Sequence, residues 1–156
     1  MNLKKNLIIL SLVLIFLVIS IKYFPWHCNS TTCIQNNPQT KTVLLKNNKI
    51  LVIVAQSEVE KERGLGGRDG LKENEGMLFV FDKPNTSGFW MKDMKFSIDI
   101  VWIRDDKVID IKKSVSKDTY PTIFYPKESA NMVLELPSGF CDTHNITVGD
   151  SFIQIQ

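Results

Sequence analysis

The chain has 156 residues, of which 44% are hydrophobic, 10% aromatic and 23% charged. This composition excludes a wholly disordered protein, and the length suits one ordinary domain with a sizeable core. The formal net charge is +2, and Lys4, Lys5 and Lys22 are the only charges before Cys28. The remainder is therefore close to neutral and lacks the basic surface that nucleic-acid binding requires, so no nucleic-acid partner is expected.

The first element in chain order is an apolar N-terminal segment. Leu7 to Ile21 is an uncharged run, and a helix extended over residues 6–26 reaches about 31 Å, enough for a hydrocarbon core of about 30 Å. Tyr23 and Trp26 then lie at headgroup depth, and the early lysines favour a cytoplasmic N-terminus. We therefore expect a signal anchor or transmembrane helix over residues 1–27. Its partner is the lipid bilayer, through residues 6–26, with residues 28–156 on the extracytoplasmic side of the cell membrane.

A cleaved signal peptide is the alternative for this segment. The lysines and the apolar run suit a secretory leader, and the best candidate cleavage site is Val18-Ile19-Ser20. Cleavage near Ser20 would give a secreted protein. A buried core helix fits poorly, because the segment is apolar on every face. Both the anchor and the leader export the same domain.

Export sets the expected chemistry of the three cysteines. In an oxidising compartment Cys28 and Cys33 can form a disulfide, which leaves Cys141 as a free thiol or a small buried apolar group. A zinc site built from His27, the cysteines and His144 fits no structural zinc pattern well. No metal and no other cofactor is therefore expected.

Residues 28–41 are predicted to be a flexible tether and residues 42–156 the extracytoplasmic domain. The tether is rich in Asn, Thr and Gln and has no apolar period. The domain opens with a predicted hairpin over residues 42–55. Ser57 then caps a predicted helix over residues 58–63, and Glu60 completes a capping box.

Short strands dominate the rest of the chain. Continuous apolar runs or alternating patterns predict strands at residues 76–81, 87–92, 97–103, 108–112, 130–136 and 151–156. This pattern predicts an all-β domain, mainly a β sandwich or barrel with one or two short helices, preceded by the N-terminal transmembrane helix.

The unusual side chains gather near the fourth strand. Trp90, Lys92 and Asp93 stand among large apolar residues. Asp99 lies inside the next strand, where a buried carboxylate needs a partner such as Lys92 or Arg68. We take these five residues as a candidate ligand-binding site, a polar spot on an aromatic-walled groove. The favoured alternative is an ion pair that stabilises the fold beside core Trp90 and Trp102, because structural ion pairs are common.

No catalytic set is complete, so no catalytic residue is assigned and binding is favoured over catalysis. Cys141 and His144 lack an orienting partner. A carboxylate-dependent envelope hydrolase with Asp99 or Glu135 as general base is one alternative. Glu135 itself is expected to face water at a strand end rather than a cleft. A structural domain that binds a protein partner is the other alternative.

Six motifs, taken in order, resemble one protein family. They are RGLGGR at 63–68, EGMLFVF at 75–81, FWMK at 89–92, IDI at 98–100, VLELPSG at 133–139 and ITVGD at 146–150. The order is similar to that of the domain of unknown function 192 family, over about residues 49–153. The resemblance implies a compact β sandwich or barrel, commonly exported, with no established activity. Asp93, Ser97 and Gly66 stand where Asn, Pro and Met are usual in the family, so the resemblance does not imply a shared ligand.

The sequence therefore predicts a membrane-anchored extracytoplasmic β domain that acts as a binding or accessory module at the cell envelope. Its expected partner is a small-molecule, glycan or peptide ligand, or an envelope protein.

Overall fold

The structure is a computed structural model that describes residues 39–155. The expected anchor, nearly all of the tether and the Cys28–Cys33 pair lie outside the described residues. In order, the elements are β1 (Thr40–Leu45), β2 (Asn48–Ala55), α2 (Glu58–Arg63), β3 (Glu75–Asn85), β4 (Phe89–Trp90), β5 (Ile98–Arg104), β6 (Lys107–Val115), the 3-10 helix η1 (Lys117–Thr119), β7 (Ile123–Phe124), β8 (Ala130–Pro137), α3 (Phe140–Thr143) and β9 (Phe152–Ile155). Between residues 39 and 155 no helix is long and apolar enough to cross a membrane.

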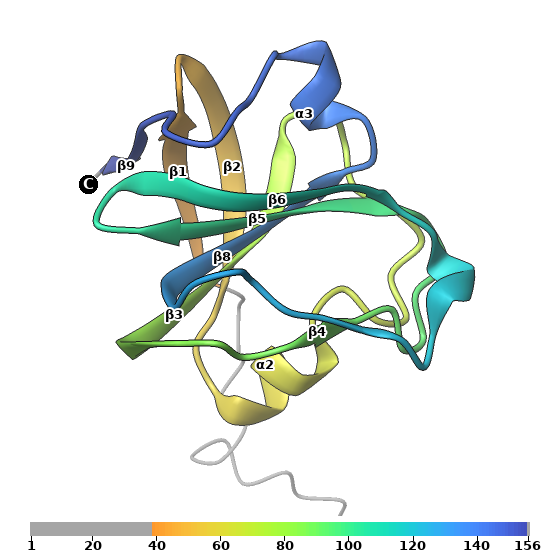
Figure 1. Cartoon of the computed structure of the whole chain (residues 1–156). Helices are drawn as coiled ribbons and strands as arrows, with labels where there is room; N and C mark the ends of the chain where they lie inside the picture. Colours follow the sequence, from red (N-terminus) through yellow and green to blue (C-terminus); the bar gives the residue numbers. More distant parts are fainter. Residues whose placement is uncertain (1–38, 156) are drawn as a thin grey trace, which may run out of the picture. The chain divides into compact units, whose positions relative to one another are not determined.

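Seven strands form one curled sheet in the order β6-β5-β8-β3-β2-β1-β9 (Figure 1). Neighbouring strands are antiparallel except β2 and β3, which are parallel and are joined through α2. At one end the two edges of the sheet meet, because Lys107 of β6 bridges Ser151 just before β9. The amide of Val108 also donates to the carbonyl of Asp150 at 2.9 Å. The all-β class is confirmed, and its form is a half barrel with short helices.

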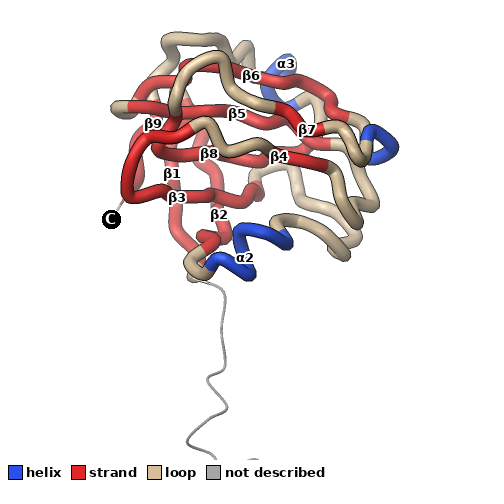
Figure 2. Tube along the Cα trace, turned by 60° about the horizontal axis from the view of Figure 1, so that its bottom comes forward, coloured by secondary structure: helices blue, strands red, loops and turns tan. Residues whose placement is uncertain are grey.

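The sheet separates two apolar layers. The inner core lies within the curl and takes side chains from all seven strands. The outer layer covers the opposite face of β3, β5 and β8, and its buried members are Ala55, Leu65, Met77, Phe79, Met91, Ile98, Ile100, Trp102, Val115, Ala130 and Val133. The two-stranded ribbon of β4 and β7 packs on this layer through Phe89 and Phe124 (Figure 2). Because both of their faces are covered, β3, β5 and β8 have nearly continuous apolar sequences.

Several elements differ from the prediction. The strand expected over residues 87–92 is reduced to β4, which pairs Phe89 with Phe124 and Trp90 with Ile123. It ends where Asp93 adopts a positive φ of 57° and the chain turns. Neither β7 nor α3 was predicted, because segments of two and four residues are too short for a periodic pattern. The expected hairpin is confirmed as β1 and β2, and the Ser57-capped helix is confirmed as α2.

Candidate functional site

A cavity of about 310 Å³ lies between α2, the glycine turn that follows it, β3 and β4. Its apolar lining is mainly aromatic, with Phe79, Phe81, Phe89 and Trp90 beside Leu65 and Met94. The rings of Phe79 and Phe89 meet edge to face, with centroids 5.0 Å apart. Pockets that hold small ligands occupy about 300–1,000 Å³, so this cavity has room for a small molecule or for one unit of a larger ligand.

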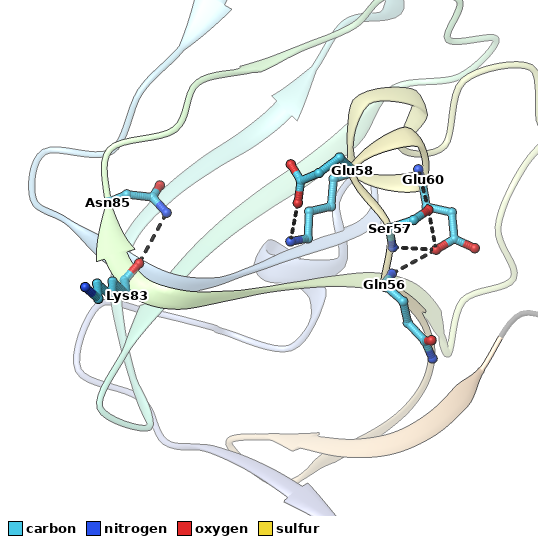
Figure 3. Close-up of polar contacts among 7 residues, drawn as sticks. Gln56, Ser57, Glu58, Glu60, Lys83 and Asn85 are labelled. Atoms are coloured by element: carbon cyan, nitrogen blue, oxygen red, sulfur yellow. Dashed lines mark hydrogen bonds and ion pairs between the residues drawn. The ribbon is translucent and has the colours of Figure 1, made fainter.

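Helix α2 supplies one side of the cavity, and its first turn is fixed by the predicted cap. The hydroxyl of Ser57 accepts a hydrogen bond from the Glu60 amide at 3.2 Å. In return the Glu60 carboxylate accepts from the amides of Ser57 and Gln56, both at 2.9 Å (Figure 3). These hydrogen bonds hold the pKa of Glu60 below its ordinary value. Gly64, with φ of 52°, ends the helix.

Charged side chains surround the aromatic wall: Glu58, Lys61, Glu62 and Arg63 from α2, and Lys92 from the turn after β4. The Lys61 ammonium is 3.0 Å from a Glu58 carboxylate oxygen and 5.3 Å from the centroid of the Phe81 ring. In the part of the chain that the structure describes, Arg63 and Lys92 form no ion pair. These two cations are therefore available to a ligand.

Glu135 of β8 also lines this cavity. In the register of the sheet it lies between Met77 of β3 and Ile100 of β5, and it therefore points into the outer layer. A Cβ atom at Gly64 would lie 3.6 Å from Oε2 of Glu135 and 3.5 Å from the Phe79 ring. The backbone at Gly64 therefore lies beside both the Glu135 carboxyl and the Phe79 ring.

The electrostatic environment of Glu135 is unusual for a carboxylate. The residue is 4% exposed, and Oε2 is buried without a hydrogen-bond partner among the described residues. Burial alone raises the pKa of this carboxyl from 4.5 to about 8. The group is therefore largely protonated at neutral pH, and it can donate a hydrogen bond, accept one, or ionise when a cation approaches.

Asp99 is also fully buried, but it lies apart from this cavity. It pairs in register with Leu136, an inner-core residue, so it points to the opposite face from Glu135. Its oxygens accept hydrogen bonds from the amides of Ser114 at 2.7 Å, Gly139 at 3.2 Å and Cys141 at 2.8 Å. Backbone N–H groups thus take the place of the expected ionic partner, Lys92 or Arg68. Through these hydrogen bonds Asp99 connects β5 to β6 and to the start of α3.

The other candidate residues divide between two places. Trp90 and Lys92 line the cavity. Arg68 and Asp93 line a neighbouring hollow that they share with Arg63. The structure therefore brings two of the five candidates to the cavity, places two beside it and places Asp99 on the other face of the sheet. Trp90 is 39% exposed and is not a core residue.

Within residues 39–155 the structure supports neither a reactive thiol at Cys141 nor a metal site with three or more His, Cys, Asp or Glu ligands. Cys141 is free and fully buried, and burial raises the pKa of its thiol far above the ordinary value, so the thiolate needed for nucleophilic attack does not form. No group of three or more His, Cys, Asp or Glu side chains in this range could hold a metal ion.

The prediction that Glu135 faces water is wrong. The alternating pattern of β8 resembles a strand with one wet face, and the second covering layer is built from distant segments that the local pattern does not reveal. One local signal was present. Glu135 stands between Leu134 and Leu136 in a strand whose residues from 132 to 136 are all buried, and such an apolar setting is typical of a strand covered on both faces.

Comparisons with known proteins agree on the fold and are silent about activity. The sequence profile of the domain of unknown function 192 (DUF192), described as an uncharacterised ACR, matches residues 40–153. No curated protein matches the chain.

Two crystal structures share the fold. A proposed transcription regulator from Sinorhizobium meliloti is 24% identical with a TM-score of 0.71, over 75% of this chain and 95% of its own. A protein of unknown function from Novosphingobium aromaticivorans is 25% identical with a TM-score of 0.65, over 74% of this chain and 84% of its own. Because the family profile spans most of the sequence, the chain belongs to the DUF192 family.

Proposed function

We propose that the domain is a binding module whose small-molecule ligand, or one unit of a glycan or peptide, enters the cavity beside α2. The observation that carries this proposal is Glu135, a residue of the cavity lining whose Oε2 atom is buried without a hydrogen-bond partner among the described residues. A buried polar atom without a hydrogen bond costs folding free energy, and a bound ligand removes that cost by supplying the missing partner.

The rest of the wall suits a ligand with both apolar and polar parts. Phe89 and the half-exposed Trp90 offer ring surfaces for a sugar face or an apolar side chain. Arg63 and Lys92, which have no ionic partner among the described residues, can donate hydrogen bonds to anionic or polar groups of the same ligand. The arrangement of few polar groups on an aromatic surface is typical of small-ligand sites.

The cell envelope is the proposed place of action. This part of the proposal rests on the sequence of residues 6–26, whose length and apolar character suit a membrane anchor. In this arrangement the tether carries the cavity on the extracytoplasmic side, where glycans, peptides and imported small molecules are encountered.

A binding screen tests the proposal. The full-length protein in detergent is titrated by calorimetry with a panel of oligosaccharides, short peptides and amino acids. We expect a ligand whose affinity falls at least tenfold in Trp90→Ala and in Lys92→Ala. The matched controls Val148→Ala and Lys49→Ala change exposed side chains away from the cavity wall and should leave the affinity unchanged. Absence of any ligand, or binding unaffected by both cavity variants, would contradict the proposal.

Hydrolysis is the second candidate, because a carboxyl with a pKa of about 8 on a cavity wall suits a general acid. Glu58 and Glu62 line the same cavity and offer a second carboxylate. Asp99 does not suit this role, since its oxygens are occupied by backbone amides. If the wild-type protein hydrolyses a glycan or peptide from the panel and Glu135→Gln abolishes this activity, hydrolysis is favoured over simple binding. Binding without turnover would favour the binding module.

A further inference from the structure

We propose that the ligand of this cavity is a small zwitterion with an apolar body, an α-amino acid or a dipeptide, whose ammonium group contacts Glu135 and whose carboxylate contacts Arg63 and Lys92. This inference rests on the proposed function and names its ligand class. It follows from the distribution of charge between the buried wall of the cavity and its rim.

The buried wall carries an acid and no cation. Glu135 has an unpartnered oxygen beside the Phe79 ring, and among the described residues no cation lies within ion-pair distance of it. The nearest side chains of the flanking strands on this face are apolar, namely Met77 and Phe79 of β3 and Ile98 and Ile100 of β5. The charged residues farther along the same face, Glu75 and Arg104, are paired with Lys72 and Glu128. All other charged groups of the cavity come from α2 and the turn after β4, and they are Glu58, Lys61, Glu62, Arg63 and Lys92.

An ammonium group is the best complement to this wall. It brings three hydrogen-bond donors and a full positive charge to the acid, and an aromatic ring attracts a cation wherever it presents its face. An anion at the same place would meet an acidic group and no cation on the buried wall. The inner end of the ligand is therefore cationic.

The rim has the opposite preference. Glu58 holds Lys61 at 3.0 Å, which leaves Arg63 and Lys92 as the cations without an ionic partner among the described residues. A carboxylate accepts charge-assisted hydrogen bonds from both kinds of side chain. A ligand with its ammonium inward, its carboxylate outward and an apolar group on the aromatic wall satisfies all three parts of the cavity.

This ligand class has a distinctive dependence on pH. In the empty cavity Glu135 is mostly protonated at pH 7, because its pKa is about 8. A bound ammonium favours the carboxylate, so binding releases a proton, and affinity rises as the pH rises from 6 to 8. A neutral or anionic ligand that accepts a hydrogen bond from Glu135 needs the protonated acid, so its affinity falls over the same range.

Calorimetry of the full-length protein in detergent tests the inference. The probes are phenylalanine, leucine and the dipeptides of these two residues, each compared with its N-acetyl and its carboxamide derivative. We expect a zwitterion to bind, the N-acetyl derivative to lose at least tenfold in affinity, and the carboxamide to lose affinity as well. Titrations in two buffers of different ionisation enthalpy should show release of close to one proton at pH 7.

The variant Glu135→Gln keeps the size of the side chain and removes its ionisation. We expect it to bind at least tenfold more weakly and to release no proton, whereas the exposed control Glu73→Gln behaves as wild type. The pH series on the wild-type protein gives the same answer without any variant, so misfolding of Glu135→Gln does not leave the question open.

Three results would overturn the inference: no zwitterion of the set binds, an N-acetyl derivative binds as tightly as its parent, or wild-type affinity falls between pH 6 and pH 8. These results do not by themselves contradict the proposed function as a binding module. If a glycan or another member of the wider panel binds through Trp90 and Lys92 while every zwitterion fails, the binding module stands and this ligand class falls. Both fall if nothing in either set binds, or if every ligand that binds is unaffected by the cavity variants.

Discussion

Asp99 and Glu135 are buried acids on neighbouring strands, and they differ in whether their carboxyl oxygens have hydrogen-bond partners. Three backbone amides donate to Asp99, so its lone pairs are used within the structure. Glu135 retains an unpartnered oxygen on the wall of a cavity. Buried polar groups are normally satisfied. Among the described residues Trp102 Nε1, Asn131 Oδ1 and Glu135 Oε2 are the exceptions, and Glu135 is the one that can ionise and that lines the cavity. We therefore assign a structural role to Asp99 and the candidate binding role to Glu135.

The pKa of Glu135 predicts a dependence of stability on pH. The folded chain holds this proton with a pKa of about 8, against an ordinary value of 4.5. The stabilisation of the folded state by protonated Glu135 is therefore fully present below pH 4.5, and it is lost as the pH rises towards 8. Relative to Glu135→Gln, the free energy of unfolding of the wild type should fall by a few kcal/mol between pH 5 and pH 8, measured by urea denaturation.

Other carboxyl groups do not obscure this comparison. Those with shifted values, Glu60, Asp69, Glu75, Asp118 and Asp150, have lowered pKa values, so their contributions are lost only as the pH falls below their ordinary range. Equal pH dependence of the wild type and Glu135→Gln over pH 5 to 8 would show that Glu135 titrates normally.

Substitution of Asp99 is predicted to affect stability and not binding. Asp99→Asn replaces one acceptor oxygen with a donor amide, which faces the backbone donors at Ser114, Gly139 or Cys141. We expect a loss of at least about 2 kcal/mol in the free energy of unfolding. Asp142→Asn, which breaks an exposed pair with Lys113, should cost less than about 1 kcal/mol. A large loss of ligand affinity in folded Asp99→Asn would place Asp99 in the site after all.

The sequence revealed part of the site. Trp90 and Lys92 stand out as an aromatic and a cation in one short segment, and both line the cavity. Arg63 could not be singled out, because a charged residue at the end of an amphipathic helix is normally solvated. The apolar neighbours of Glu135 indicate burial but not the cavity, because the segments that form the cavity around it, the Gly64 turn and β4, are far from β8 in the chain.

At the scale of elements, α2 determines whether the cavity has a second side. Its six residues are too few for a helix that is stable by itself, and none of them is buried. The capping box at Ser57 and the turn at Gly64 therefore carry much of its stability. Cap and cavity are coupled through Lys61 and Arg63, which project from this helix into the rim.

Removal of the cap should therefore weaken both the helix and the site. Ser57→Ala deletes the acceptor for the Glu60 amide, and we expect a loss of about 1 kcal/mol in the free energy of unfolding with weaker ligand binding. Ser57→Thr keeps the acceptor and should behave nearly as wild type. Hydrogen exchange of the amides of residues 58–63 measures fraying directly, and unchanged exchange in Ser57→Ala would contradict this role of the cap.

The elements that were predicted correctly share one property: their signal is local. The apolar run of β3 and the turn between β1 and β2 are visible within a few residues. The ribbon of β4 and β7 depends instead on contact between distant segments. There Gly88 lacks a Cβ atom that would collide with Ile123 and Tyr125, and no local pattern predicts this pairing.

For the whole molecule, the curled sheet provides a support with two apolar faces. One is filled by the inner core, and the other is covered by the segment after α2, which includes Leu65, and by the β4–β7 ribbon. The cavity lies where this second covering is incomplete. A ligand can therefore bind on the outer layer without disturbing the inner core, which contains side chains from all seven strands.

The apolar segment at residues 6–26 predicts the location of the whole chain. In the native host, full-length protein should sediment with membranes and resist extraction by salt. Proteinase added to cells with a permeable outer surface should cleave the domain. Deletion of residues 1–27 should leave the protein in the cytosolic fraction. Full-length protein in the cytosolic fraction, or a domain protected from proteinase, would contradict the anchor.

The most direct test concerns the state of one carboxyl group. In protein labelled with ¹³C at glutamate carboxyl carbons, the signal of Glu135, assigned by its absence in Glu135→Gln, is followed against pH. An uncompensated acid on the cavity wall should titrate with a midpoint near 8, as burial raises the pKa of this group to about that value. The midpoint should move downward when a ligand with an ammonium group is bound. A midpoint near the ordinary 4.5 in the free protein would show that Glu135 is already paired or solvated.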